Sequence, residues 1–455
     1  MYVFISPNAL GAFADDIGAV IYDISFTLPS LVALFDVFAS VSNLRLNVGK
    51  CCCIPLCDAS ASEAFVAKFA ELAPTWSEIA IQDHAEYLGF VLGPGACINM
   101  WSNVVAKALD TVSRWKKIAA GFFFNVIASN IFILSLFSFV GQLACPDSSV
   151  GDCITTMRNS LFSGPGNWLP PCLLNNLKEL GFPVQARDPF AAMLASKVRI
   201  ALTSQLDIDT MSTELGLRRI SWQRLHDKSH PHWDWHHNTF VFNVVCARND
   251  FRDMIEGSSD ALSIQDVRSM CVEKQGGQKI IYTMMKRSDS PVPAAIVFNK
   301  MRHRLDRWKH LFAIPIGHVN QRLENRFSML GGVAKPSLIA VYLRTMLNGW
   351  ITERRMRGIS TTLRETCPFC KRARDSLEHF AFCPVVTDLY QQHGIQLAPP
   401  NNFLQFLGLM KEDNGPRIFT IVKLLSVLYS THNTLRHNPD LEPKDIIRIA
   451  VYALF

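Results

Sequence analysis

The spacing of the apolar residues changes near residue 100, and this change limits the chain to an α+β fold that is predominantly helical. Before that point, short apolar runs alternate with turn residues, which is typical of short strands. From Trp101 onward, apolar residues recur at intervals of three and four, which predicts helices. Hydrophobic residues make up 49% of the 455 residues, so the chain has ample material for a packed core.

The first hundred residues are predicted to form a hairpin, two helices and two further strands. The hairpin has its turn at Asp15-Asp16, between two short apolar runs. The expected helices cover residues 28–43 and 59–72. The expected strands are Leu44–Val48, which alternates, and Tyr87–Leu92, which stops at Gly93-Pro94-Gly95. Further breaks are predicted at residues 146–151, 164–171, 288–293 and 331–336.

Positive charge is concentrated in one segment. Residues 300–374 hold sixteen Lys/Arg and four Asp/Glu, a local charge of +12 in a chain whose net charge is +6. A concentrated basic segment indicates a polyanionic partner such as nucleic acid. The alternative from charge alone is a solvated helical surface.

One uncharged stretch raises the question of a membrane. Residues 118–144 are long enough to span a bilayer. However, Asn125, Asn130, Gln142 and three serines interrupt this stretch, which favours a buried pair of core helices. Residues 1–12 lack the features of a signal peptide, and thirteen unevenly placed cysteines do not suggest a disulfide framework. We therefore expect a reduced, intracellular protein in the nucleus, the cytoplasm or both.

The acidic turn Phe13-Ala14-Asp15-Asp16 could contribute to a magnesium site. Mg²⁺ prefers carboxylate oxygens on a rigid scaffold, and polymerases use two such ions to activate the attacking hydroxyl and stabilise the leaving group. Taken alone, the tetrapeptide is weak evidence, because paired aspartates are common in surface turns. The motifs that follow it carry more weight.

Three motifs follow the acidic turn in a fixed order. They are Ser42–Cys51 (SNLRLNVGKC), Glu86–Gly95 (EYLGFVLGPG) and a helix that carries Trp101, Lys107 and Trp115. This ordered set resembles the palm and thumb of non-LTR (LINE-type) retrotransposon reverse transcriptases. In that family an aromatic-Ala-Asp-Asp turn precedes a GLKLNxxKC-like strand, a YLGxxxG strand and the thumb helices.

The resemblance implies roles for residues that match the family's motifs. Asp15 would be a Mg²⁺ ligand, and Asp16 would support the metal site. The implied partners are an RNA template, a DNA primer or target, and a deoxynucleoside triphosphate. The other matched residues would contact primer or nucleotide: Phe13 beside the growing primer end, Lys50 near the incoming nucleotide, and Tyr87, Leu88 and Gly89 in the primer grip.

The chain departs from the family at its front. The family has another aspartate on an earlier palm strand, preceded by fingers, whereas twelve residues precede Phe13 here. We therefore expect a truncated protein whose Mg²⁺ binding is weak or lost and which does not polymerise DNA alone. Detectable primer extension on an RNA template by the purified 455-residue chain would contradict this expectation.

A second cluster predicts a metal site from spacing alone. Cys367, Cys370, His379 and Cys383 form the pattern C-x2-C-x8-H-x3-C. A close cysteine pair on a turn suits tetrahedral zinc, and a helix would place residues four apart on one face. Four ligands with none to spare indicate a structural Zn²⁺ site. The alternative is two unrelated pairs.

This cluster also matches the family, whose members often end in a CCHC module after a GxxTxxR-like segment, here Arg344–Arg355. Many relatives place four residues between the last histidine and cysteine, whereas this chain has three. The implied function is RNA or DNA binding through phosphate contacts, with Trp350 and Phe369 either stacking on bases or packing in the local core. The expected nucleic-acid-binding residues are Arg344, Arg354, Arg355, Arg357, Lys371 and Arg372.

These patterns together predict five regions: a partial reverse transcriptase palm (1–100), thumb-like helices (101–145), a helical connecting region (146–335), a basic segment with the CCHC module (336–395) and C-terminal helices (396–455). The alternative is a non-catalytic nucleic-acid-binding protein that uses the basic C-terminal half and the zinc module. A weaker alternative is a membrane-associated helical protein. The histidines between His230 and His237 have no standard ligand spacing, and we expect them to pack or to face solvent.

Overall fold

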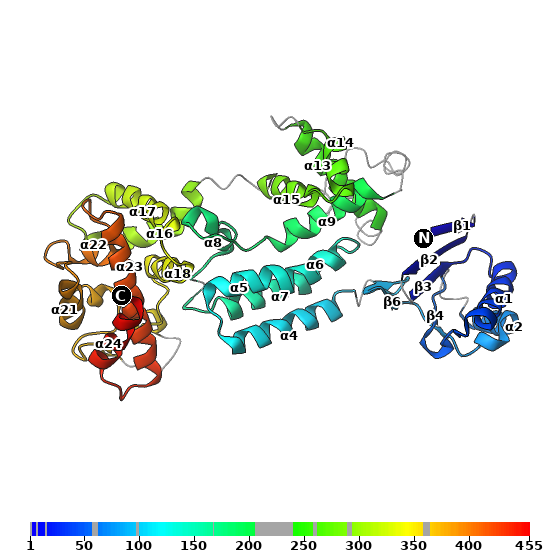
Figure 1. Ribbon diagram of the computed structural model, residues 1–455, viewed down its shortest axis with the longest axis horizontal. Coiled ribbons are helices and arrows are strands. Elements are labelled where there is room, and N and C mark those ends of the chain that lie inside the picture. Colours follow the sequence, from blue (N-terminus) through cyan, green and yellow to red (C-terminus); the bar gives the residue numbers. More distant parts are fainter. Residues whose placement is uncertain are drawn as a thin grey trace. The chain divides into compact units, whose positions relative to one another are not determined.

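The computed structural model describes residues 2–5, 8–13, 16–56, 62–96, 100–166, 168–204, 240–257, 262–288, 294–357 and 365–455 (Figure 1). Asp15 and the His230–His237 cluster lie outside these residues. The described chain is mostly helical with a few short strands, which confirms the predicted α+β, predominantly helical class. It divides into two compact units, residues 1–106 with 144–147, and residues 107–143 with 148–455.

The first unit holds the strands. Its elements are β1 (Tyr2–Ile5), β2 (Asn8–Phe13), β3 (Asp16–Val20), α1 (Ile24–Ser42), the 3₁₀ turn η1 (Val48–Lys50), β4 (Cys52–Cys53), α2 (Ser62–Leu72), the 3₁₀ turn η3 (Pro74–Trp76), β5 (Ala80–Ile81), β6 (Ala85–Tyr87) and β7 (Phe90–Leu92).

The predicted hairpin at the acidic turn is confirmed. Strands β2 and β3 pair antiparallel with Phe13 opposite Asp16, so two residues connect them and Asp16 already belongs to β3. Strand β1, which the sequence pattern did not separate, adds to the other edge of β2.

Both helices predicted in this unit are present. The Asp23 carboxylate caps α1 by accepting from the backbone N–H groups of Ser25 and Phe26, and Asn43 ends the helix in the left-handed conformation. Helix α1 packs on α2 through a small core. Its buried members are Leu28, Phe69, Ala73, Trp76 and Ile79.

Two strand predictions are wrong. Leu44–Val48 alternates in sequence but forms no strand, and the strand that does form, Cys52–Cys53, pairs parallel with Ala80–Ile81 a few residues later. Tyr87–Leu92 is not one strand but a tight hairpin, with Tyr87 opposite Phe90. Leu88 and Gly89 have φ values of 50° and 81° and form its turn, because positive φ at both central residues matches the twist of a two-residue hairpin.

The second unit is entirely helical in its described part. After α4 (Ser102–Ile118), which begins in the first unit, its elements are α5 (Phe122–Ala128), the π-helical turn η4 (Ser129–Ile133), α6 (Leu134–Gly141), α7 (Ser148–Leu161), α8 (Pro171–Leu174), η5 (Leu177–Leu180), α9 (Pro189–Thr203), α13 (Phe240–Glu256), α14 (Ile264–Val272), α15 (Gly277–Ser288), α16 (Ala294–Arg307), η6 (Lys309–Leu311), α17 (Ile316–Gly331), α18 (Pro336–Met346), α19 (Glu353–Met356), α20 (Leu377–Phe380), α21 (Pro384–Gln392), α22 (Asn402–Leu407), α23 (Gly415–His437) and α24 (Pro443–Leu454).

Two helices organise the packing of this unit. Helix α9 packs against α6, α13, α14 and α15. Helix α23 packs against α17, α18, α21 and α24, and ten of its residues are buried. Helices α17 and α18 of the basic segment and α21 of the metal-binding segment therefore pack against α23, next to the site described below.

The uncharged stretch 118–144 is one helical run rather than the predicted pair of core helices. Helix α5, the π-helical turn and α6 continue from Phe122 to Gly141. Val126, Ile133 and Phe137 are buried, whereas Phe132 is about half exposed. Two runs, Ile24–Ser42 and Phe122–Gly141, are long and apolar enough to cross a membrane by length and composition, a test that soluble core helices and signal sequences also pass.

Candidate metal centre

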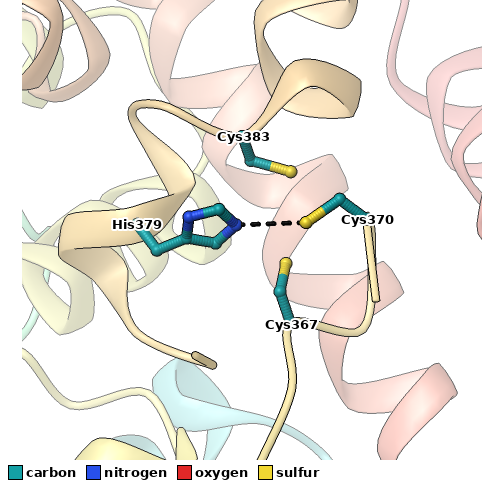
Figure 2. Close-up of side chains that lie close together, drawn as sticks. All are labelled: Cys367, Cys370, His379 and Cys383. Atoms are coloured by element: carbon teal, nitrogen blue, oxygen red, sulfur yellow. Dashed lines mark hydrogen bonds between the residues drawn. The ribbon is translucent and has the colours of Figure 1, made fainter. Parts of the chain in front are cut away.

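The four residues of the C-x2-C-x8-H-x3-C pattern come together. Figure 2 shows their side chains pointing toward one another, and their ligand atoms all lie within 4.8 Å of one another. Cys370 Sγ and His379 Nε2 lie 3.2 Å apart. Sulfur ligands of tetrahedral zinc, with Zn–S bonds of about 2.3 Å, lie roughly 3.8 Å apart. The cluster could therefore hold a metal ion such as zinc, and the predicted convergence of these four residues is confirmed.

A tight turn presents the first two cysteines. The backbone N–H of Cys367 donates to the Ala373 carbonyl, and the Lys371 N–H donates to the Cys367 carbonyl at 2.9 Å. Lys371 has a φ of 57°, in the left-handed region that closes such turns. A single β-bridge between Thr366 and Arg374 fixes the base of the turn.

The other two ligands come from two helices, not from one helix face as their spacing of four predicted. His379 lies in α20, where its N–H donates to the capping Ser376 hydroxyl at 3.1 Å. Helix α20 ends at Phe380, and Cys383 has extended backbone as the N-cap of α21. Pro384 at the first helical position begins a new helix rather than continuing the old one. The break turns the two ligands toward each other.

The contact with Cys367, more than the position at a helix start, favours the thiolate form of Cys383. A hydrogen bond with the Cys367 thiol, assisted by the Val386 backbone at the start of α21, lowers the pKa of Cys383. The same contact, with burial, raises the pKa of Cys367. Thiols near helix N-termini ionise more readily, and a metal ligand must be deprotonated.

Aromatic side chains pack the metal-ligand segment onto α23. The rings of Phe369 and Phe380 meet edge to face at 5.2 Å, and Trp350 lies 5.7 Å from Phe380 and 5.1 Å from Tyr429. Trp350 is fully buried and Phe369 is only 4% exposed. Of the two alternatives for these aromatics, packing in the local core is therefore confirmed, and stacking on bases is excluded in this conformation.

A buried polar link joins the same segment to α23. One Asp375 carboxylate oxygen accepts from the Glu353 backbone N–H at 3.0 Å, and both oxygens lie 3.2 Å from His432 Nε2. Asp375 and His432 are 6% and 2% exposed. The sequence reasoning missed both residues, because 57 positions separate them and no local pattern connects them.

The predicted nucleic-acid-binding cations fall into two groups. Arg344 is half-buried, with its guanidinium 4.2 Å from the Trp168 ring centre, and it donates to the Ser163 carbonyl. Arg355 donates to the Pro165 carbonyl at 3.2 Å. The remaining four are exposed: Arg354, which pairs with Glu378, Lys371, which pairs with Glu442, and Arg357 and Arg372.

The structure brings the hairpin at the acidic turn and the segment around Tyr87 together. A Cβ placed on Gly18 of β3 would lie 3.0 Å from Tyr87 Cζ, so the tyrosine ring packs over the strand that begins with Asp16. Asp16 is exposed, and Lys50 is exposed at the end of η1. Asp15, the expected Mg²⁺ ligand, and the side chain of Phe13 lie outside what the structure describes.

No protein-family model and no curated protein matches the chain.

Proposed function

We propose that the chain derives from a LINE-type reverse transcriptase and that its C-terminal region binds nucleic acid on a scaffold stabilised by zinc. The observation that carries the proposal is the convergence of Cys367, Cys370, His379 and Cys383. Three thiolates and one imidazole suit zinc better than magnesium or calcium, which prefer oxygen ligands. Four protein ligands leave no open position, so the bound ion would act structurally.

The metal would fix the basic segment around it. When bound, it would hold the turn that carries Lys371 and Arg372 against α20 and the start of α21. Glu378, next to the ligand His379, accepts from Trp308 Nε1 at 2.8 Å and pairs with Arg354. The metal ligands and the surrounding cations thus form one connected region, as phosphate binding by a preorganised surface requires.

The first unit supports the ancestry part of the proposal. The hairpin that presents Asp16 and the Tyr87–Phe90 hairpin lie against each other through Gly18. A palm needs its acidic turn and its primer-grip hairpin on one scaffold, which agrees with this contact. The roles of Asp15, Asp16 and Mg²⁺, and the division into palm, thumb and connecting region, are part of the same proposal.

Binding of labelled nucleic acid by the full zinc-loaded chain tests the function. We expect a labelled single-stranded RNA and a DNA duplex to bind with an affinity that falls steeply with salt, because phosphate contacts release counterions. A chain without measurable binding to either probe at low salt, or with binding that salt does not weaken, would contradict the proposal. Binding without primer extension fits both the proposal and the non-catalytic alternative, whereas primer extension would contradict the expected loss of polymerase activity.

A further inference from the structure

Phe382 is an exposed aromatic residue in the metal-ligand segment. Its side chain is 50% exposed, whereas Phe380, Ala381 and Cys383 around it are fully buried. Among the described residues from 294 to 440, no other phenylalanine, tyrosine or tryptophan is exposed. A single exposed apolar side chain is common on protein surfaces, so exposure alone assigns no role. The place of Phe382 in the metal centre is what gives it one.

The backbone of Phe382 is held on both sides of the ring. Its N–H donates to the His379 carbonyl at 2.8 Å, and the Cys383 N–H donates to the Phe380 carbonyl at 3.3 Å. His379 and Cys383 are two of the four converging ligand residues, so a bound metal would also fix this turn at both ends. A ring on such a turn has little backbone freedom to lose when it binds, which favours binding.

Two exposed cations lie on the other turn of the metal centre. Lys371 and Arg372 directly follow the ligand residue Cys370, and both are exposed. Lys371 pairs with Glu442 on the surface, whereas Arg372 forms no ion pair with any described residue. The Arg372 guanidinium can therefore bind a phosphate group without first breaking a salt bridge.

The two turns meet at the ligand atoms, which all lie within 4.8 Å of one another. Figure 2 shows Cys370 and Cys383 facing each other across this meeting point. Lys371 and Phe382 each lie one residue from one of these cysteines, so their Cα atoms are at most about 18 Å apart. One short strand can therefore reach both the cations and the ring.

We propose that Phe382 stacks on an unpaired base of a single strand whose phosphates contact Lys371 and Arg372; this rests on the proposed function. A surface ring reaches the face of a base only where that base is not stacked inside a duplex, which selects a single strand. Because every base has such a face, the ring adds affinity without reading the sequence. It takes the role that the buried Trp350 and Phe369 cannot fill.

Two substitutions in the full zinc-loaded chain test this residue. Phe382→Ala removes the ring and Phe382→Tyr keeps it. Phe190→Ala is the matched control, because Phe190 is 45% exposed on α9. The probes are labelled single-stranded oligothymidine and an abasic strand with the same number of phosphates, so that they differ only in their bases.

We expect Phe382→Ala to bind oligothymidine about fivefold or more weakly than the wild type does, because the stacked base loses its platform. Its affinity for the abasic strand should not change. The salt dependence of oligothymidine binding should also stay the same, since no charge is removed. Phe382→Tyr and Phe190→Ala should bind both strands as the wild type does.

Phe382→Ala with wild-type affinity for oligothymidine would overturn the stacking role and leave the ring to a protein partner. Equal losses for the two strands would overturn it as well, because the ring would then not act through a base. Both results leave the proposed nucleic-acid binding intact. A wild-type chain that binds neither strand would reject the proposed function and the stacking role together.

Zinc content and thermal unfolding of each variant show whether the metal centre is intact. Both should match the wild type in Phe382→Ala, since the side chain is on the surface. If this variant loses zinc, Phe382→Leu replaces it, because leucine keeps the apolar bulk but has no planar face. The same selective loss for oligothymidine is then expected, and its absence would contradict the proposal.

Discussion

We expect Cys383→Ser to reduce bound zinc to well below one equivalent and to destabilise the α23 side of the second unit severely. Cys383 is fully buried, faces the other three ligand residues, and has a lowered pKa that favours the thiolate. Structural zinc contributes about 10–16 kcal/mol of apparent binding free energy in zinc-finger peptides, and this is folding free energy. Because the surrounding core should keep part of the structure without zinc, we expect the free energy of unfolding to fall by several kcal/mol, on the order of half of the zinc-finger value or less.

Zinc content by mass spectrometry or atomic emission, together with thermal unfolding, measures the effect. Cys52→Ser is the matched control, because Cys52 is an exposed cysteine of the first unit. It should keep both zinc and melting temperature. A chelator added to the wild type should lower its melting temperature to that of the Cys383→Ser variant. If Cys383→Ser retains a full equivalent of zinc, the four residues do not form the site.

Asp375→Ala should be the second most damaging substitution, with a loss of about 3 kcal/mol in the free energy of unfolding. The substitution leaves the Glu353 N–H and His432 Nε2 buried without their acceptor. Burying an unpaired donor costs more than the net energy of the bond it replaces, because the lost hydration is not regained. Denaturant unfolding, read by far-ultraviolet circular dichroism, measures the change in the free energy of unfolding.

Asp388→Asn serves as the control, since Asp388 is an exposed carboxylate on α21. It should change stability by less than about 0.5 kcal/mol. Asp375→Asn keeps one acceptor oxygen and should fall between the two. If Asp375→Ala and Asp388→Asn are equally mild, the carboxylate does not hold the metal-ligand segment on α23.

The metal centre could be predicted from the sequence because its four ligand residues lie close together in the chain. Cys367 and Cys370, with two residues between them on a turn, restrict each other's positions, and the remaining ligands follow within 13 residues of Cys370. Even here the backbone departs from expectation, since His379 and Cys383 belong to two helices separated by a break at Pro384. Spacing identifies which residues meet, whereas the path between them depends on the capping of each short helix.

The strand predictions were wrong where pairing decides the outcome. An alternating run such as Leu44–Val48 becomes a strand only beside a partner, and the partner strand Ala80–Ile81 takes Cys52–Cys53 instead. The turn at Leu88 could not be anticipated, because a positive φ is uncommon for leucine and the residue looks like part of a strand.

Long-range contacts explain the residues that the sequence patterns missed. Asp375 contacts His432 across 57 positions, and Arg344 donates to the Ser163 carbonyl across 181 positions. The packing of elements far apart in the sequence brings these groups together, so no local pattern could predict the contacts.

The placement of Arg344 bears on how this region can be inherited. Its guanidinium lies over Trp168 and within 5.5 Å of the Tyr429 ring centre, and it donates to a carbonyl 181 positions earlier. Zinc-binding segments in many proteins behave as self-contained cassettes that recombination can transplant. A rearrangement that moved residues 336–455 without residues 163–168 would carry a half-buried guanidinium into its new setting without its ring and its acceptor. We therefore expect residues 336–455 to keep their packing in a rearranged protein only when the loop that accepts Arg344 moves with them.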